Sequence, residues 1–244
     1  MATMLAAMLC MGFASVIGGA SGFGTALIAT PLMLLAGIGV TEIVVVNIVV
    51  GLVTRIAATY QLREHIDWHR VALLGGASLP GAWLGILTVN MLPEQYLKPA
   101  AGVVAVLCGA LMALPTAKEP APPSRAANIA VGTIGGYFTT TTSMNGPPVV
   151  LLLSRAKLPP MNFIADLAGY FIVTGTLSLA LLWIYTDVQP ISMWPLLSGC
   201  IAAGLLGNHL GMWIAGRIPA ERFRTGVIAL VIGAGVLTIV SAQF

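Results

Sequence analysis

Six hydroxyl and amide side chains interrupt an apolar stretch in the second half of the chain, where the sequence reads TTTTSMNGPPVV from Thr139 to Val150. They lead directly into a Gly-Pro-Pro break. Proline lacks an N–H and suits a first helical turn, so a new helix is expected to begin there. Its N-terminus would present free N–H groups and a partial positive charge, which predicts a site for a small oxyanion. The candidate residues are Thr140, Thr141, Thr142, Ser143, Asn145, Gly146 and Pro147.

A second segment, near the start of the chain, lines up with this one. SGFGTALI, from Ser21 to Ile28, matches the segment that starts at Ser143. Its glycines allow close approach of the backbone to a ligand, and its hydroxyls add donors. The candidates here are Ser21, Gly22, Gly24 and Thr25. The alternative for both segments is that the hydroxyls only satisfy backbone groups at kinks and pack helices closely.

The composition predicts that both segments lie inside a membrane. The chain has 244 residues, of which 58% are hydrophobic and 8% charged, and its mean hydropathy is +0.96. So few charges cannot cover a soluble domain of this size, whereas most of the uncharged stretches are long enough to cross a bilayer as helices. Broken backbone at membrane depth is tolerated only where it lines a cavity enclosed by protein. No basic stripe indicates nucleic-acid binding.

The chain divides into two similar halves. Gly85, Pro93, Lys98 and Gly109 correspond to Gly211, Pro219, Arg224 and Gly235, each 126 positions later. A polar, proline-rich segment joins the halves. We therefore predict a first transmembrane repeat over residues 1–115, a cytoplasmic linker over 116–125 and a second repeat over 126–244. Internal repeats of this kind are the building plan of many secondary transporters.

The distribution of Lys and Arg predicts how the halves are oriented. If residues 126–154 enter the membrane, break and leave by the same face, nine cations outside the spans share one face and only Lys98 lies opposite. The positive-inside rule favours this arrangement. Each repeat is then a broken-helix hairpin, or two short helices, followed by three transmembrane helices. The fold class expected is an all-α polytopic membrane protein with two inverted-topology repeats and both termini outside the cytoplasm.

Four further polar residues lie in or beside apolar spans. Arg55 is a counter-charge for the anion, or it extends to the membrane interface. Asn47, on the same predicted helix, faces the broken segment. Asp166 and His209 are the candidates for proton coupling; the alternatives are an interfacial cap for Asp166 and an interhelical hydrogen bond for His209.

The sequence contains no recognisable catalytic set. It has no nucleotide-binding loop, and the spans lack the paired nucleophile and base of membrane enzymes. His65, Asp67 and His69 are interpreted as solvated loop charge instead of a metal site. We therefore predict a protein that is not an enzyme and that has no metal and no cofactor.

Two segments resemble the signature segments of the sulfite exporter TauE/SafE family of membrane permeases. They are IGGASGFGTALIATPLMLLAGI near the start and GTIGGYFTTTTSMNGPPVVLLLSRAKLP after the linker. The resemblance implies that the protein moves sulfur-containing anions, such as sulfite, thiosulfate or an organosulfonate, across the inner membrane. It adds Phe23 and Met144 to the two binding tips. An anion channel and a scaffold subunit of a larger complex are the alternatives. The expected partners are the bilayer and a small anionic substrate, with a homodimer as a candidate assembly.

Overall fold

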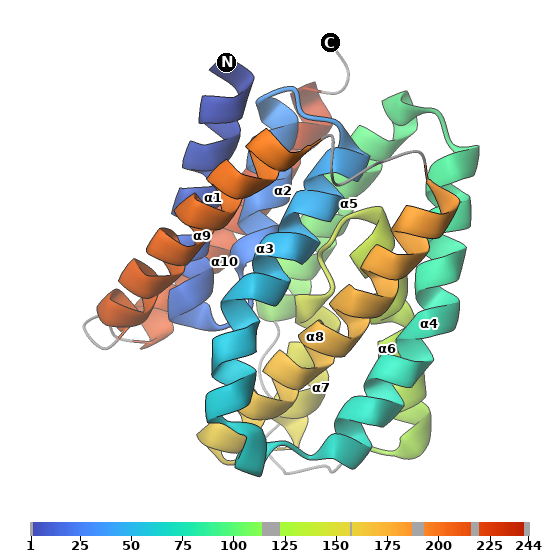
Figure 1. Ribbon diagram of the computed structural model, residues 1–244, viewed down its shortest axis with the longest axis vertical. Helices are drawn as coiled ribbons and strands as arrows, with labels where there is room; N and C mark the ends of the chain where they lie inside the picture. Colours follow the sequence, from blue (N-terminus) through green and yellow to red (C-terminus); the bar gives the residue numbers. More distant parts are fainter. Residues whose placement is uncertain (1, 114–122, 157, 187–192, 216–219, 242–244) are drawn as a thin grey trace.

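The structure, a computed structural model, describes residues 2–113, 123–156, 158–186, 193–215 and 220–241. All regular elements in these ranges are helical (Figure 1). In chain order they are α1 (Ala2–Ser21), α2 (Thr25–Leu35), α3 (Val40–Gln61), the short 3-10 helix η1 (Arg63–His65), α4 (Trp68–Met91), α5 (Glu94–Ala113), α6 (Arg125–Thr141), α7 (Gly146–Arg155), α8 (Pro160–Tyr185), α9 (Trp194–Ala215) and α10 (Ala220–Ser241).

Helix lengths and composition confirm an all-α polytopic membrane protein. Within the described residues, five helical segments are long and apolar enough to cross a membrane, in α1, α4, α5, α8 and α9. By contrast, α2 has 11 residues and α7 has 10. At about 1.5 Å per residue these two helices reach only about halfway through hydrocarbon roughly 30 Å thick. They are half-helices that begin inside the bundle.

Both half-helices follow a break in the backbone. The first break contains Gly22, at φ 83°, and the second contains Ser143, a non-glycine residue at φ 59° in the left-handed region. The second break is confirmed, although it spans only residues 142–145, because the Gly-Pro-Pro segment already forms the first turn of α7. The helices before the breaks are longer than half-helices, with 20 residues in α1 and 17 in α6.

The helix packing repeats when the two halves are exchanged. The α4 helix packs along α6 and the α1 helix packs along α9, while α5 packs along α10 and α3 along α8. The start of α1 and the end of α10 lie at the same end of the bundle, and α6 begins at the other end (Figure 1). This arrangement is compatible with two repeats of opposite orientation. The boundaries predicted for them remain predictions.

Glycines bring the paired helices into close contact. A Cβ placed on Gly81 of α4 would lie 1.8 Å from the carbonyl oxygen of Thr133 on α6. The matching pair repeats this geometry, because a Cβ on Gly211 of α9 would lie 2.0 Å from the carbonyl oxygen of Val16 on α1. Small residues allow such backbone approach in membranes, where helix association depends on van der Waals packing. These close contacts therefore hold α1 and α6, the longer helices of the two broken hairpins, in place.

We expect Gly81→Ala to destabilise the protein by about 1–3 kcal/mol, because the added methyl group overpacks the α4–α6 contact. Gly76→Ala is the matched control on the same helix, since a Cβ there meets nothing within 4 Å. Thermal unfolding of the two variants in detergent measures the difference. Equal unfolding temperatures would show that the close contact does not exist in solution.

Candidate functional site

A small cavity lies where the two breaks meet helices α3 and α8. Its volume is about 60 Å³. Because one water needs roughly 10–15 Å³ by this measure, the cavity has room for about four waters or one small solute. The residues that line it are Phe23, Thr25, Ala26, Asn47, Ile48, Gly51, Leu52, Thr54, Arg55, Thr139, Ser143, Asn145, Phe171 and Gly175.

The break before α7 supplies one wall of the cavity. Asn145 is the N-cap residue of α7, but its side chain does not cap the helix. Instead, its amide nitrogen donates to the hydroxyl of Thr139, at 2.9 Å. Ser143 stands beside it with its backbone in the left-handed conformation. A residue other than glycine rarely adopts this conformation unless the surrounding structure holds it there.

A buried hydrogen-bond network holds Ser143 in that conformation. The amide nitrogen of Asn47 on α3 donates to the hydroxyl of Ser143 at 2.8 Å and to that of Thr30 on α2 at 2.9 Å. Both hydroxyls are within reach of the Thr142 carbonyl oxygen, at 2.6 Å from Ser143 and 3.1 Å from Thr30. The network therefore joins the second break to the half-helix of the first hairpin.

The break before α2 supplies the opposite wall. Thr25 and Ala26 belong to the first turn of α2, whose N–H groups have no partner within the helix. The Ser21 hydroxyl accepts from the N–H of Gly24 at 3.1 Å, which closes the turn that leads into this helix. The first turn of α2 and the N-cap residue of α7 thus both lie at the cavity. The partial positive charge of two helix N-termini falls there.

Arg55 adds a full positive charge. Its guanidinium carbon lies 4.0 Å from the centroid of the Phe171 ring, a cation–π contact between α3 and α8. Within the part of the chain that the structure describes, Arg55 forms no ion pair with a carboxylate. A cavity with one arginine and two helix N-termini suits a small anion that provides the missing negative charge.

The structure brings six of the predicted binding residues to this cavity: Phe23, Thr25, Asn47, Arg55, Ser143 and Asn145. It does not place the others there, which are Ser21, Gly22, Gly24, Thr140, Thr141, Thr142, Met144, Gly146 and Pro147. The three threonines use their hydroxyls on backbone carbonyls. Thr140 donates to Ala82 on α4 at 2.9 Å, and Thr141 donates to Tyr137 at 2.8 Å. These three hydroxyls therefore follow the alternative interpretation, in which they satisfy backbone groups and support helix packing.

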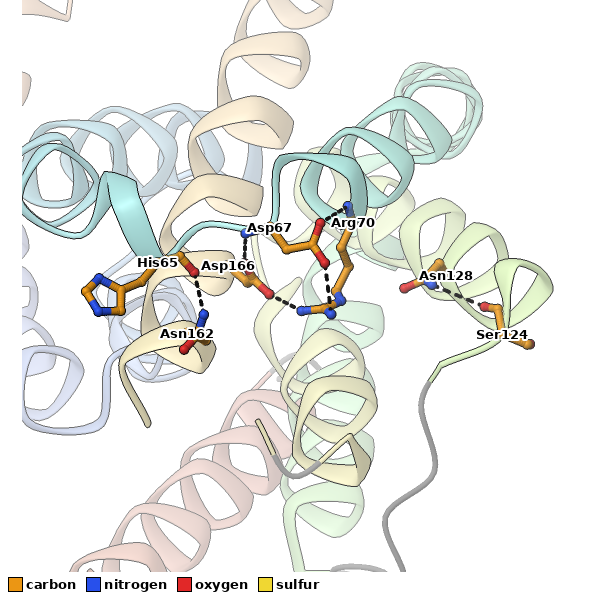
Figure 2. A network of polar contacts seen from close by, with 7 residues as sticks. All are labelled: His65, Asp67, Arg70, Ser124, Asn128, Asn162 and Asp166. Atoms are coloured by element: carbon orange, nitrogen blue, oxygen red, sulfur yellow. Dashed lines mark hydrogen bonds and ion pairs between the residues drawn. The ribbon is translucent and has the colours of Figure 1, made fainter. Parts of the chain in front are cut away.

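Asp166 and His209 both lie outside the cavity lining. Asp166 is fully buried and joins the start of α8 to the start of α4 (Figure 2). It forms an ion pair with Arg70 and accepts the N–H of Asp67 at 2.7 Å. Close by, the amide of Asn162 donates to the carbonyl oxygen of His65 at 2.9 Å. His209 is an exposed residue of α9. Proton coupling through either residue stays a prediction.

Several lining residues were absent from the sequence-based set, and the repeat contains a signal for some of them. Gly51 and Gly175 both line the cavity, and so do Asn47 and Phe171. Each pair is separated by 124 positions, within the range of offsets that relates the two halves. The repeat therefore relates Phe171 to the predicted residue Asn47, which makes Phe171 a candidate lining residue. Nothing in the sequence distinguishes Thr139, which lines the cavity, from the three threonines that follow it.

A positively charged cavity between two broken hairpins of a polytopic helical bundle is an arrangement found in many secondary transporters. The family model described as "Sulfite exporter TauE/SafE" matches residues 7–238, so the chain belongs to that family. The "Probable sulfite/organosulfonate exporter TauE" of Cupriavidus necator is 28% identical over 166 residues, which cover 64% of this chain and 62% of that protein. No solved structure matches the chain.

We expect removal of Asp166 to cost stability, because it leaves Arg70 without its buried partner. Asp166→Leu and Arg70→Leu should each destabilise the protein by about 3–5 kcal/mol, whereas the double variant should recover part of that loss. Thermal unfolding of the three variants tests the pair. Additive losses in the double variant would contradict a direct interaction.

Proposed function

We propose that the protein is a permease that moves a small sulfur-containing anion across the inner membrane by alternating access. The observation that carries this proposal is Arg55, a cation without an acidic partner among the described residues, at a cavity next to the N-termini of two half-helices. Membership of the TauE/SafE family and the name of the Cupriavidus relative favour a sulfur anion over other oxyanions.

The size of the cavity favours a compact substrate. Its volume of about 60 Å³ suits sulfite, which has four heavy atoms, better than a long organosulfonate. Apolar residues, among them Phe23, Ile48, Leu52 and Phe171, line part of the cavity. Apolar walls combined with a few convergent donors are typical of small-molecule sites.

Helix α3 links this cavity to a wider one near the end of the bundle where α1 starts. The wider cavity has a volume of about 580 Å³ and is lined by the start of α3, including Val40 and Glu42, and by Asn90 and Tyr185 at the ends of α4 and α8. Between the two cavities, α3 is buried from Ile43 to Val46. This closed segment is the barrier that alternating access would have to open.

The proposed orientation puts both termini outside the cytoplasm and the repeats at 1–115 and 126–244, joined by a cytoplasmic linker at 116–125. A homodimer is the proposed assembly. In this orientation the wider cavity faces away from the cytoplasm. Export of an anion from a negative interior is favourable by about 2.3 kcal/mol per charge per 100 mV, so export requires no coupling ion.

Reconstitution of the protein in liposomes tests the proposed function. At least one of labelled sulfite, thiosulfate and sulfoacetate should be transported with saturation, and Arg55→Gln should raise the KM of that anion by about 10–100-fold, because it removes a charge-assisted hydrogen bond. Arg63→Gln is the control, since Arg63 lies over Tyr60, outside the residues that line the cavity. If a correctly folded protein transports none of the three anions, the proposal is wrong.

Filling the cavity tests its role independently of charge. Gly51 lines the cavity and a Cβ there meets nothing within 4 Å, so Gly51→Leu should fold normally and occupy the substrate space. We expect transport to fall at least about tenfold, because the leucine side chain takes up the space in which the solute would be buried. Gly233→Leu on α10 is the control, since a Cβ on Gly233 also meets nothing within 4 Å. Equal transport by both variants would place the pathway elsewhere.

A further inference from the structure

The hydrogen bonds around Asn47 determine which way its amide faces. The hydroxyls of Thr30 and Ser143 can both direct their protons at the carbonyl oxygen of Thr142. Each hydroxyl oxygen then accepts one of the two N–H groups of the Asn47 amide. Both N–H groups of the Asn47 amide are then used, and its oxygen takes part in neither of these two hydrogen bonds.

That oxygen has no partner. Asn47 is 7% exposed, and its Oδ1 is buried without a hydrogen bond within the described part of the protein. Four other buried polar side-chain atoms there share this condition, on Thr59, Asn128, Tyr170 and Ser178, but none of those residues lines the cavity. A buried acceptor without a donor costs free energy, so such a group in a native structure points to an absent partner.

A solute in this cavity therefore has to provide both negatively charged acceptor oxygens and a hydrogen-bond donor. Arg55 and the first turn of α2 can only donate, so they bind the negatively charged oxygens. Asn47 Oδ1 can only accept, so it requires an N–H or O–H group. A donor-free anion would satisfy the first requirement and leave Oδ1 unpaired, which is the kind of mismatch that produces strong discrimination between substrates.

We propose that Asn47 determines specificity by selecting sulfur monoanions that carry a hydrogen-bond donor. Hydrogensulfite and small hydroxysulfonates belong to this class, whereas the sulfite dianion, thiosulfate and methanesulfonate do not. This inference rests on the proposed transport function, because it concerns the same cavity. It identifies the protonation state and the functional group that the transported solute must have.

Two sulfonates that differ by one hydroxyl group test the inference. Hydroxymethanesulfonate and methanesulfonate are both monoanions of similar size, so charge does not separate them. Calorimetric titration of the purified full-length protein at mildly acidic pH should show about 5–50-fold tighter binding of the hydroxylated compound, the effect of one buried acceptor left unpaired. Asn47→Leu removes the acceptor, so it should reduce this ratio to about one.

Asn128→Leu is the matched control, because Asn128 is also buried with an unpaired Oδ1 but lies outside the cavity lining. It should keep the wild-type ratio. Equal binding of the two sulfonates by the wild-type protein would overturn the inference, with or without a stable Asn47 variant, and would leave the proposed function intact. Persistence of the ratio in Asn47→Leu would overturn it as well. If neither sulfonate nor sulfite binds, the proposed function fails, and with it the inference.

Discussion

The hydrogen bonds from Asn47 to Thr30 and Ser143 are the interaction on which the centre of the molecule depends. A helix that stops inside a membrane leaves carbonyl and N–H groups that lipid cannot satisfy. Here the Thr142 carbonyl at the end of α6 receives hydroxyl donors from its own break and from α2. One amide on α3 thereby holds two half-helices from different parts of the chain around a common space.

Polar side chains near the breaks serve two separate purposes. Thr140, Thr141 and Thr142 direct their hydroxyls at backbone carbonyls, so they support the helices that end there. Arg55 and the free N–H groups of α2 remain available at the cavity. The charge of the site is positive because Arg55 lines it and no Asp or Glu is among its lining residues. The described ion pairs, of Asp67 and Asp166 with Arg70, lie at the end of the bundle.

The elements of the site were predictable from the sequence, but its inner surface was not. Proline, glycine and the clustered hydroxyls locate both breaks, and composition identifies the membrane spans. Successive residues of a helix point about 100° apart, so the sequence cannot tell that Thr139 faces the cavity while Thr140 faces Ala82. Contacts such as Arg55 with Phe171, or Arg70 with Asp166, join distant segments and depend on how helices cross. Those crossings follow from packing, which no local pattern records.

The pairing of α1 with α9 has a consequence for biogenesis. The face of α1 that carries Gly12 meets Ala203 and Gly207, near the end of the chain. During synthesis α1 enters the bilayer long before α9 exists, and its small-residue face must meanwhile lie against lipid or an insertion factor. The helix that packs along α1 belongs to the second half of the chain, and the helix that packs along α6 belongs to the first half. The α1–α9 and α4–α6 pairs can therefore form only after helices of both halves have been synthesised.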